Sequence, residues 1–368
     1  MNPKSDKKSP KVVISGYYGF DNCGDEAVLL AIIHCLRTLR PDVRIVVLSG
    51  NPKKTRKLYS VEAVNRWNPI KLALQIISCR LVISGGGSLL QDVTSTKSLR
   101  YYTAIINFAA ILGKRVMIYS QGIGPLNSEK NRIRVSRAIN RCHTVSVRDE
   151  RSAELLRELG VHRSIQEFCD PVVALSHDDV DYREIEEELR LYGSNRKPMM
   201  VAVRRWRDDR HLAPVAEFLD SQVKSGRDVL LVAAHYPEDM EAVDKVIGMM
   251  AEVPLRLDKC LTARQFLALS AHACMVFSMR LHGLICAFAV GTPILGLSYD
   301  PKVEAFMEQA GLGKYCMSFD SFSKDTAQRL AAELDIPPPQ STQEPRRQEM
   351  RNLAWRAAQK AAELLMRV

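Results

Sequence analysis

The sequence predicts an α/β protein made of two doubly wound, parallel-sheet domains that face each other across a cleft. Its 368 residues suffice for two such domains of ordinary size. Short runs rich in β-branched residues alternate with amphipathic helical segments in two successive series, which is typical of parallel sheets with helical crossovers. A polar, charged stretch at residues 176–197 separates the two series. We therefore predict two Rossmann-like domains.

The first series shows how strands and helices alternate. In the helix after the first strand, Asp25 and Glu26 lie in the first turn, where the helix dipole favours carboxylates. Apolar residues then recur at helical spacing up to Leu39, and Pro41 ends the helix. The predicted strands of this series are Val12–Ser15, Ile45–Leu48, Leu81–Ser84, Val116–Tyr119 and Thr144–Val147.

The second series begins near Pro198, after the polar stretch. That stretch contains a predicted helix, Asp181–Tyr192, followed by Gly193 and small polar residues, which is typical of a linker. We predict an N-terminal domain at 1–175, a linker at 176–197, a C-terminal domain at 198–340 and a basic C-terminal helix within 341–368. The predicted strands of the second series are Met199–Val203, Val229–Ala233, Met275–Ser278 and Ile294–Leu297.

Composition narrows the class of protein. Hydrophobic residues make up 46% and charged residues 26%, which is typical of a soluble globular chain, and no apolar run approaches the ~18 residues that cross a bilayer. The N-terminus up to Lys11 lacks the apolar core of a secretory signal and is expected to be a short disordered tail. Nine dispersed cysteines without a CxxC pair indicate reduced thiols in the cytoplasm and no zinc site.

The net charge is +10, from 52 basic and 42 acidic residues. Such a surface attracts polyanions, anionic lipid headgroups or small phosphorylated ligands. The sequence contains no helix-turn-helix, zinc-finger or RNA-binding signature and no basic run interleaved with aromatic residues. We therefore predict no nucleic-acid partner.

Ligands of open parallel sheets bind beyond the carboxyl ends of the strands, so the residues that follow each strand are the candidates. The loop after the first strand opens with Gly16, and Gly19 and Gly24 have the spacing of a phosphate-binding loop. Asp25 stands where that motif needs a lysine, which excludes it. The glycines would allow a sugar to approach, with Asn22 and Asp25 accepting hydrogen bonds from its hydroxyls. A tight turn with a helix cap is the alternative.

Two more loops of the first series contain candidates. Gly86 and Gly87 belong to a run of three glycines after the third strand, which lets the backbone approach a ligand or another loop, and the same loop ends at Asp92. Arg148 follows the fifth strand, where a long cation is well placed for an anion. The alternative is a surface arginine paired with Asp149 or Glu150.

Cations and hydroxyls follow every strand of the second series. A helix predicted to begin at Leu281–Gly283 adds backbone N–H donors suited to phosphate. Any one such residue is more often structural, but their repetition at successive strand ends is what a small, highly charged anion requires. In chain order the candidates are Arg204, Arg207, His235, Ser278, Arg280, His282 and Ser298.

Four of these segments resemble the polysaccharide pyruvyltransferase family, and they stand in the family's order. The resemblance extends from about Lys11 to about Gly313. The chain is especially similar to the bacterial branch of this family that pyruvylates N-acetylmannosamine in a lipid-linked secondary cell-wall polymer. That polymer anchors surface-layer proteins. The four segments are Asn22-Cys23-Gly24-Asp25-Glu26, Gly85-Gly86-Gly87-Ser88-Leu89-Leu90-Gln91-Asp92, Ser146-Val147-Arg148-Asp149-Glu150 and Ser278-Met279-Arg280-Leu281-His282-Gly283.

The resemblance implies a GT-B-like fold, phosphoenolpyruvate as the donor bound by the C-terminal domain, an acceptor-side N-terminal domain and no cofactor. It implies that Arg148, Arg280 and His282 are active-site residues. Because guanidinium groups bind phosphate and carboxylate in a bidentate manner, we expect Arg148 and Arg280 to clamp the donor, with Arg204 or Arg207 assisting. His282 is the candidate proton donor and acceptor. We predict no metal, since Asp92 and Asp300, the two carboxylates that could hold one, belong to no recognisable ligand cluster.

Two other functions remain as alternatives. Many nucleotide-sugar glycosyltransferases of the same architecture carry two glutamates eight residues apart, whereas Glu304 is followed at that spacing by Leu312. The net charge and the helix Ala354–Arg367 would also fit a non-catalytic protein that binds polyanions or membrane surfaces. A lipid-linked acceptor disaccharide would itself bring the enzyme to the inner membrane face. We therefore expect a cytoplasmic location with weak, salt-sensitive binding to anionic membranes.

Overall fold

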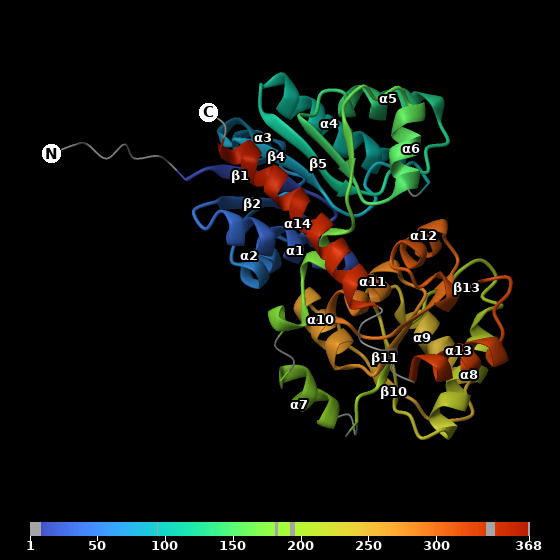
Figure 1. Cartoon of the computed structure of the whole chain (residues 1–368). Coiled ribbons are helices and arrows are strands. Elements are labelled where there is room, and N and C mark those ends of the chain that lie inside the picture. Colours follow the sequence, from blue (N-terminus) through green and yellow to red (C-terminus); the bar gives the residue numbers. More distant parts are fainter. Residues whose placement is uncertain (1–8, 94, 181–182, 192–195, 336–342, 367–368) are drawn as a thin grey trace. The chain divides into compact units, whose positions relative to one another are not determined.

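The chain folds into two compact units, each an α/β domain (Figure 1). The computed structural model describes residues 9–93, 95–180, 183–191, 196–335 and 343–366. Unit 1 comprises the chain up to Phe20, Val28–Pro171 and the end of the chain from Leu353. Unit 2 comprises Asp21–Ala27 and Val172–Asn352. Most of the predicted N-terminal tail lies outside the described residues, as does part of the predicted linker.

Unit 1 is built on a seven-stranded parallel sheet in the order β3-β2-β1-β4-β5-β6-β7. This is the order of a doubly wound dinucleotide-binding fold. Strands are added on one side of β1 up to β3 and then on its other side from β4, so the strand order reverses between β1 and β4. The strands are β1 (Lys11–Ser15), β2 (Arg44–Ser49), β3 (Glu62–Asn65), β4 (Leu81–Gly85), β5 (Arg115–Gln121), β6 (Thr144–Val147) and β7 (Ile165–Glu167).

Helices cover both faces of this sheet. On one face a single apolar core joins α3, α4, α5 and α6 to the strands, with Val82 and Ile118 among its fully buried strand residues. Helix α1 has Asp25 and Glu26 in its first turn and Arg37 in its last, so the predicted helix is present and begins two residues earlier than expected. The helices are α1 (Cys23–Leu39), α2 (Pro52–Tyr59), α3 (Pro69–Ser78), α4 (Thr96–Ile111), α5 (Glu129–Ile139) and α6 (Glu150–Glu158), followed by the 3₁₀ turn η1 (Pro171–Ala174).

Unit 2 repeats this architecture with a six-stranded parallel sheet in the order β10-β9-β8-β11-β12-β13. Its chain reversal falls between β8 and β11. The strands are β8 (Met199–Ala202), β9 (Val229–Val232), β10 (Leu255–Leu257), β11 (Met275–Ser278), β12 (Ile294–Ser298) and β13 (Cys316–Ser318). The helices are η2 (His177–Asp179), α7 (Arg183–Leu191), α8 (Leu212–Lys224), α9 (Met240–Met249), α10 (Ala263–His272), α11 (Leu281–Val290), α12 (Pro301–Gln309), η3 (Gly313–Tyr315) and α13 (Lys324–Asp335).

All nine predicted strands are present, with ends that shift by at most two residues. Four strands, β3, β7, β10 and β13, were not predicted. Each is only three or four residues long and lies at an edge of its sheet, so it carries little of the apolar periodicity that marks a strand. The parallel pairings throughout place the ends of β8, β9, β11 and β12 at one edge of the second sheet.

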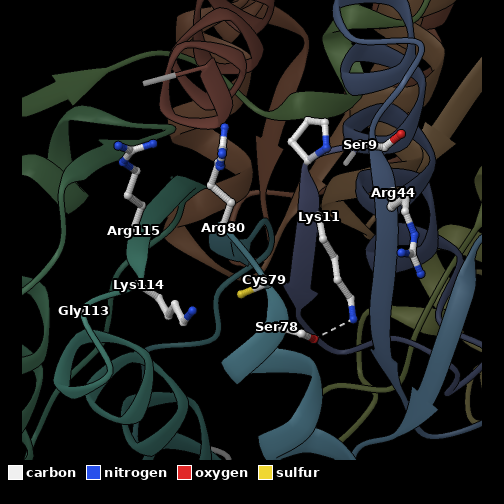
Figure 2. Close-up of a pocket in the computed structure, with 10 residues that line it drawn as sticks. Ser9, Lys11, Arg44, Ser78, Cys79, Arg80, Gly113, Lys114 and Arg115 are labelled. Atoms are coloured by element: carbon white, nitrogen blue, oxygen red, sulfur yellow. Dashed lines mark hydrogen bonds between the residues drawn. The ribbon is translucent and has the colours of Figure 1, made fainter. Parts of the chain in front are cut away.

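The last helix, α14 (Glu344–Met366), does not form the separate segment that the sequence suggested. Its residues up to Asn352 belong to unit 2, and those from Leu353 belong to unit 1. Its small apolar residues are buried, including Ala357 and Ala361, and Arg80 and Arg115 donate hydrogen bonds of 2.9 and 2.6 Å to carbonyl oxygens in its last turn (Figure 2 shows both side chains). This helix packs its apolar face into the protein and does not present it to a membrane, which corrects the basis of one alternative function.

Candidate functional site

The chain reversal of unit 2 brings two arginines to the same edge of its sheet. Arg204 follows β8 and Arg280 follows β11, and these two strands pair directly, with Ala202 opposite Ser278. Crevices at such reversals are where open α/β sheets bind ligands. The structure thus places these two sequence-predicted residues after the ends of neighbouring strands.

Arg280 is held by a buried carboxylate. Its Nε donates to Oδ2 of Asp239 at 2.9 Å, and its Nη2 donates to Oδ1 of the same residue, which makes a bidentate pair. Asp239 is only 2% exposed and also accepts a hydrogen bond from the backbone N–H of His235. A bidentate partner fixes the plane of a guanidinium group. The edge of the Arg280 guanidinium group that does not face Asp239 therefore also has a defined orientation.

His282 lies in the first turn of α11, two residues after Arg280, and packs on a glycine backbone. A Cβ atom on Gly24 would come within 2.4 Å of Nδ1 of His282, so no larger residue fits without moving the ring. On the same turn, a Cβ on Gly283 would meet Oγ of Ser278 at 2.4 Å. Two glycines therefore let this turn and its imidazole fit closely against their surroundings.

The segment that supplies Gly24 is part of unit 2 although it opens the first helix of the chain. Asn22 forms an antiparallel bridge with His235, and the backbone N–H of Cys23 donates to the carbonyl oxygen of Ala234 at 2.9 Å. The side chain of Asn22 accepts hydrogen bonds from the backbone N–H groups of Gly24 and Asp25 at 3.0 and 3.4 Å. Asn22 thus caps the helix, as the alternative interpretation of this loop proposed.

Arg204 lies against two aromatic rings. Its Nη1 donates to the hydroxyl of Tyr299 at 2.8 Å, and its guanidinium carbon is 4.8 Å from the Tyr299 ring and 5.6 Å from the Trp206 ring. A buried histidine, His211, hydrogen bonds to the Arg204 carbonyl oxygen at 3.0 Å through Nε2. Burial lowers the pKa of His211 below its ordinary value, although the hydrogen bond to Arg204 acts in the opposite direction.

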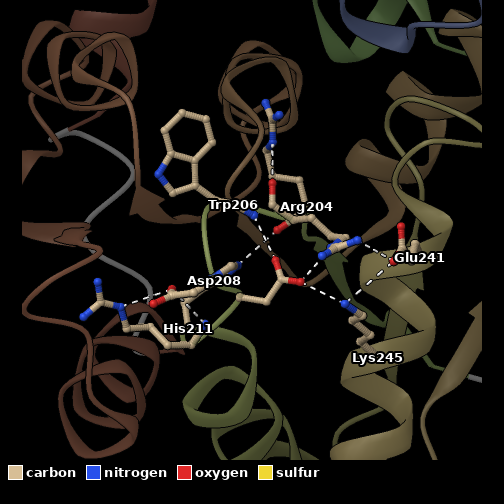
Figure 3. A network of polar contacts seen from close by, with 9 residues as sticks. Arg204, Trp206, Asp208, His211, Glu241 and Lys245 are labelled. Carbon is tan, nitrogen blue, oxygen red and sulfur yellow. Dashed lines mark hydrogen bonds and ion pairs between the residues drawn. The ribbon is translucent and has the colours of Figure 1, made fainter.

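The loop that contains Arg204 is tied to helix α9 by ion pairs (Figure 3). Arg205 and Lys245 both contact Asp209, at 2.6 and 2.9 Å, and both contact Glu241. Burial favours the protonated form of Asp209, yet hydrogen bonds from Lys245 and Arg205 keep its pKa below the ordinary value. Arg205 therefore has a structural role. The neighbouring Arg204 takes no part in these ion pairs and lies at the edge of the sheet after β8.

The remaining candidates of unit 2 differ in what they contact. Ser278 is fully buried and exchanges hydrogen bonds with the backbone of Arg280, so its hydroxyl shapes the turn. Ser298 is 3% exposed and donates to Oε1 of Glu304 at 3.0 Å. Arg207 is exposed and has a left-handed backbone with φ of 52°. Their roles as ligand-binding residues stay predictions.

In unit 1, Arg148 is buried, unlike the surface arginine of the alternative interpretation, although its Nε lies 3.6 Å from Oδ2 of Asp149, the partner that this alternative predicted. Arg148 is 6% exposed, and its Nη1 donates to Oδ2 of Asp170 at 3.1 Å. Its Nη2 donates to the hydroxyl of Ser88 at 3.1 Å in the glycine-rich loop, and a Cβ on Gly122 would come within 3.0 Å of the guanidinium group. Arg148 thus joins the ends of β4, β5, β6 and β7.

The other candidates of unit 1 have structural contacts as well. Gly86 and Gly87 have φ of 52° and 67°, a conformation that favours glycine, and a Cβ on Gly86 would overlap Val28. A Cβ on Gly16 would collide with the ring of Tyr18. Asp92 accepts hydrogen bonds from the start of α5, and these keep its pKa below the ordinary value although burial acts against them.

Sequence reasoning missed two charged side chains of these sites. Asp239 does not directly follow a strand but precedes helix α9, where an acidic residue is common. Only the structure reveals that it binds Arg280. Arg66 is 3% exposed, donates to the carbonyl oxygen of Gly16 at 3.1 Å and lies 4.3 Å from the Tyr101 ring. It follows β3, which was not predicted, so its position at a strand end was not visible.

Across the described ranges, no group of three or more histidine, cysteine, aspartate or glutamate side chains is arranged to hold a metal ion. Within the same part of the chain, every helix is too short or too polar to cross a bilayer.

Comparison with known proteins adds a family and a fold. The family model described as polysaccharide pyruvyl transferase matches residues 22–301. No curated protein matches the chain. Among solved structures, UDP-GlcNAc 2-epimerase from Neisseria meningitidis has a TM-score of 0.60 at 12% identity and covers 97% of this chain and 99% of its own.

Two further structures share the fold at similarly low identity. UDP-GlcNAc 2-epimerase from Methanocaldococcus jannaschii has a TM-score of 0.61 at 11% identity and covers 90% of this chain and 93% of its own. ADP-heptose LPS heptosyltransferase II from E. coli has a TM-score of 0.51 at 14% identity, covering 89% of this chain and 98% of its own. These likenesses confirm the predicted GT-B-like fold of two Rossmann-like domains.

Proposed function

Because this chain belongs to the polysaccharide pyruvyl transferase family and is a pyruvyltransferase, we propose that it takes the pyruvyl group from phosphoenolpyruvate. We propose as acceptor a sugar of a lipid-linked secondary cell-wall polymer precursor, N-acetylmannosamine, on which a pyruvate ketal forms. The family excludes the non-catalytic alternative for this chain. The proposed location is the cytoplasm, at the inner face of the membrane.

The observation that carries the donor proposal is the pairing of Arg280 and His282 on one helix turn. Arg280 is oriented by Asp239, and His282 lies two residues further along at the start of α11. Phosphoenolpyruvate carries a phosphate and a carboxylate on three carbons, so a guanidinium group beside a proton-transferring imidazole suits both its charge and its chemistry. Arg204, at the end of the neighbouring strand, is the second cation of this donor site.

The proposed reaction begins with protonation of the donor's methylene carbon, which becomes the methyl group of the ketal. The adjacent carbon then carries positive charge and is attacked by one hydroxyl of the sugar. Phosphate leaves with the electron pair of its C–O bond, and a second sugar hydroxyl closes the ketal ring as its proton is lost. Over the cycle the two hydroxyls release two protons, of which one replaces the proton given to carbon and the other is taken up by the phosphate product.

In this scheme His282 transfers protons and Arg280 binds the donor. The His282 ring packs closely on Gly24, which limits the positions that the ring can take. The role of Arg148 in the clamp stays a prediction, since this side chain also fixes the loops of unit 1.

The direct test is mass spectrometry of a lipid-linked disaccharide incubated with the enzyme and phosphoenolpyruvate. The product should gain roughly 70 Da, because the pyruvyl unit replaces two hydroxyl protons, with one phosphate released per ketal. A matched incubation with a UDP-sugar tests the glycosyltransferase alternative. Release of UDP with transfer of a whole sugar, and no phosphate from phosphoenolpyruvate, would exclude the proposed reaction.

A further inference from the structure

The amino edge of the sheet in unit 1, opposite its ligand-binding loops, contains a cationic pocket (Figure 2). The pocket has a volume of about 540 Å³, and five cations line it: Lys11, Arg44, Arg80, Lys114 and Arg115. They come from the starts of β1, β2, β4 and β5, and no carboxylate is among the residues that line the pocket. Basic residues at or just before the first residue of four parallel strands thus concentrate positive charge at one edge.

Contacts to neutral groups hold part of this charge in place. Arg80 donates to the carbonyl oxygen of Leu365, and Lys11 donates to the hydroxyl of Ser78 at 2.8 Å. Arg44, by contrast, pairs with Glu62 at 2.8 Å. Because a hydroxyl or a carbonyl does not cancel a full positive charge, the pocket remains suited to an anion.

An exposed apolar ridge borders the pocket. Trp67, Ile70, Leu74 and Ile77 follow one another at spacings of three and four residues and are 64%, 72%, 58% and 51% exposed. Ile70, Leu74 and Ile77 form one stripe along α3, which Trp67 precedes, and the other side of the helix packs Ile76 into the core. Helix α3 ends at Ser78, which lines the pocket. The last residue of the ridge, Ile77, thus directly precedes a residue of the pocket.

A second apolar group completes the border. Ile111 and Leu112, at the end of α4, are 74% and 38% exposed and directly precede Gly113 and Lys114 of the pocket. Six of the eleven exposed large apolar side chains in the described part of the chain thus lie on the ridge or at this helix end. Soluble surfaces seldom gather apolar side chains in this way unless the surface binds something.

We propose that the ridge, the end of α4 and the cationic pocket together form a docking face for an anionic lipid bilayer. Apolar side chains of this kind enter the boundary between headgroups and acyl chains, while basic groups beside them bind the lipid phosphates. The two kinds of residue adjoin on this face, and this complementarity selects a lipid surface over a purely apolar partner. In this proposal the membrane contact is this face in place of α14, whose alanines and last two leucines are buried.

The direction of the ridge fits a lipid-linked substrate. Its far end, Trp67, lies 5.0 Å from the guanidinium carbon of Arg66, which donates to the carbonyl oxygen of Gly16 at the carboxyl end of β1. A bilayer along this ridge would therefore reach the edge of the sheet where the loops lie. Only this biological meaning rests on the proposed acceptor, because the docking itself depends on the residues of the face.

The test is co-sedimentation of the full chain with phosphatidylglycerol vesicles and with phosphatidylcholine vesicles, at about 0.02 M and about 0.5 M salt. We expect binding to phosphatidylglycerol that weakens at high salt. Leu74→Ser/Ile77→Ser should reduce it by roughly tenfold or more, because two exposed apolar anchors are lost. The matched control is Met249→Ser/Val253→Ser, which removes exposed apolar side chains from unit 2 and should bind as the parent does.

Charge is tested separately with Lys114→Gln, which should weaken binding about fivefold, against Lys324→Gln on an exposed helix start of unit 2. In the parent, brominated lipids should quench the tryptophan fluorescence, and this quenching should be lost in Trp67→Phe. Absent binding at low salt, or equal losses in variant and control, would overturn the proposal, as would a ridge variant that changes only the oligomeric state. Turnover on a short soluble acceptor should be unchanged. Vesicle binding without any pyruvyl transfer would leave this inference standing and refute the proposed function.

Discussion

The pair between Asp239 and Arg280 provides the sharpest test of the donor site. Asp239→Asn keeps the size of the side chain and removes its charge. An asparagine has one oxygen to accept a hydrogen bond, so one of the two bonds from Arg280 is lost and its amide group faces a guanidinium donor. A hydrogen bond to a charged group contributes about 1.5–3 kcal/mol. If that energy orients Arg280 for the donor, kcat/KM should fall about 10- to 150-fold.

The assay is phosphate release at varied phosphoenolpyruvate concentration. Because Asp239 acts through Arg280, we expect the KM for phosphoenolpyruvate to rise more than kcat falls. Glu241→Gln is the matched control, since it is the same carboxylate-to-amide change on the same helix in an exposed ion pair. Exposed pairs contribute about 0–1 kcal/mol, so this variant should stay close to the parent in both rate and unfolding temperature.

A double-mutant cycle separates positioning from general damage. Arg280→Lys removes the planar fork and should be harmful by itself, and adding Asp239→Asn should then cost much less than it does in the parent. Additive losses would mean that the two residues act independently. An Asp239→Asn enzyme with unchanged or raised kcat/KM and unaltered stability would refute the reasoning, because it would mean that the carboxylate does not orient the arginine for the donor.

Three further predictions concern other residues. His282→Ala should lower kcat by about 10²–10⁴ without loss of stability, and nearly normal turnover would exclude proton transfer by this residue. Arg148→Met should lower the free energy of unfolding by about 3–5 kcal/mol, measured in urea, because Asp170 stays 2% exposed without its cation, and a loss below about 1 kcal/mol would contradict this. Burial depresses the pKa of His211 below its unfolded value of 6.5, so its contribution to stability is complete above about pH 6.5 and is lost as pH falls through the depressed pKa. His211→Gln should therefore flatten the loss of unfolding temperature between about pH 7 and 5, and an unchanged profile would contradict it.

The central strands and the residues that follow them were predictable because buried strands have a recognisable apolar sequence pattern. Strands such as Leu81–Gly85 are buried on both faces and appear as short continuous apolar runs, so the residue after each one can be named without a structure. Arg280 and Arg204 were identified in this way. The parallel order of the strands then brings them to one edge, which follows from the topology alone.

The partners of those residues were not predictable, since they depend on long-range contacts. Asp239 is 41 positions from Arg280, and Gly24 is far from His282 in the chain although the two are in contact. The beginning of α1 looks from sequence like part of the first domain, but it belongs to the second unit, where the backbone N–H of Cys23 donates to the carbonyl oxygen of Ala234. No local pattern signals such an exchange of a segment.

Two helical glycines, Gly24 and Gly283, lower helix stability but allow close packing around the turn that contains His282. Both lie inside the first turn or so of a helix, without the left-handed backbone that would require glycine. Glycine in a helix is about 0.5–1 kcal/mol less favourable than alanine, so helix stability alone would select against both positions. Each instead leaves room for one specific neighbour: Gly24 for the His282 ring and Gly283 for the Ser278 hydroxyl that shapes the turn after β11. The same two glycines, which weaken their helices, thus let the His282 ring and the Ser278 hydroxyl pack closely at the start of α11, where Asp239 orients Arg280 two residues before the histidine.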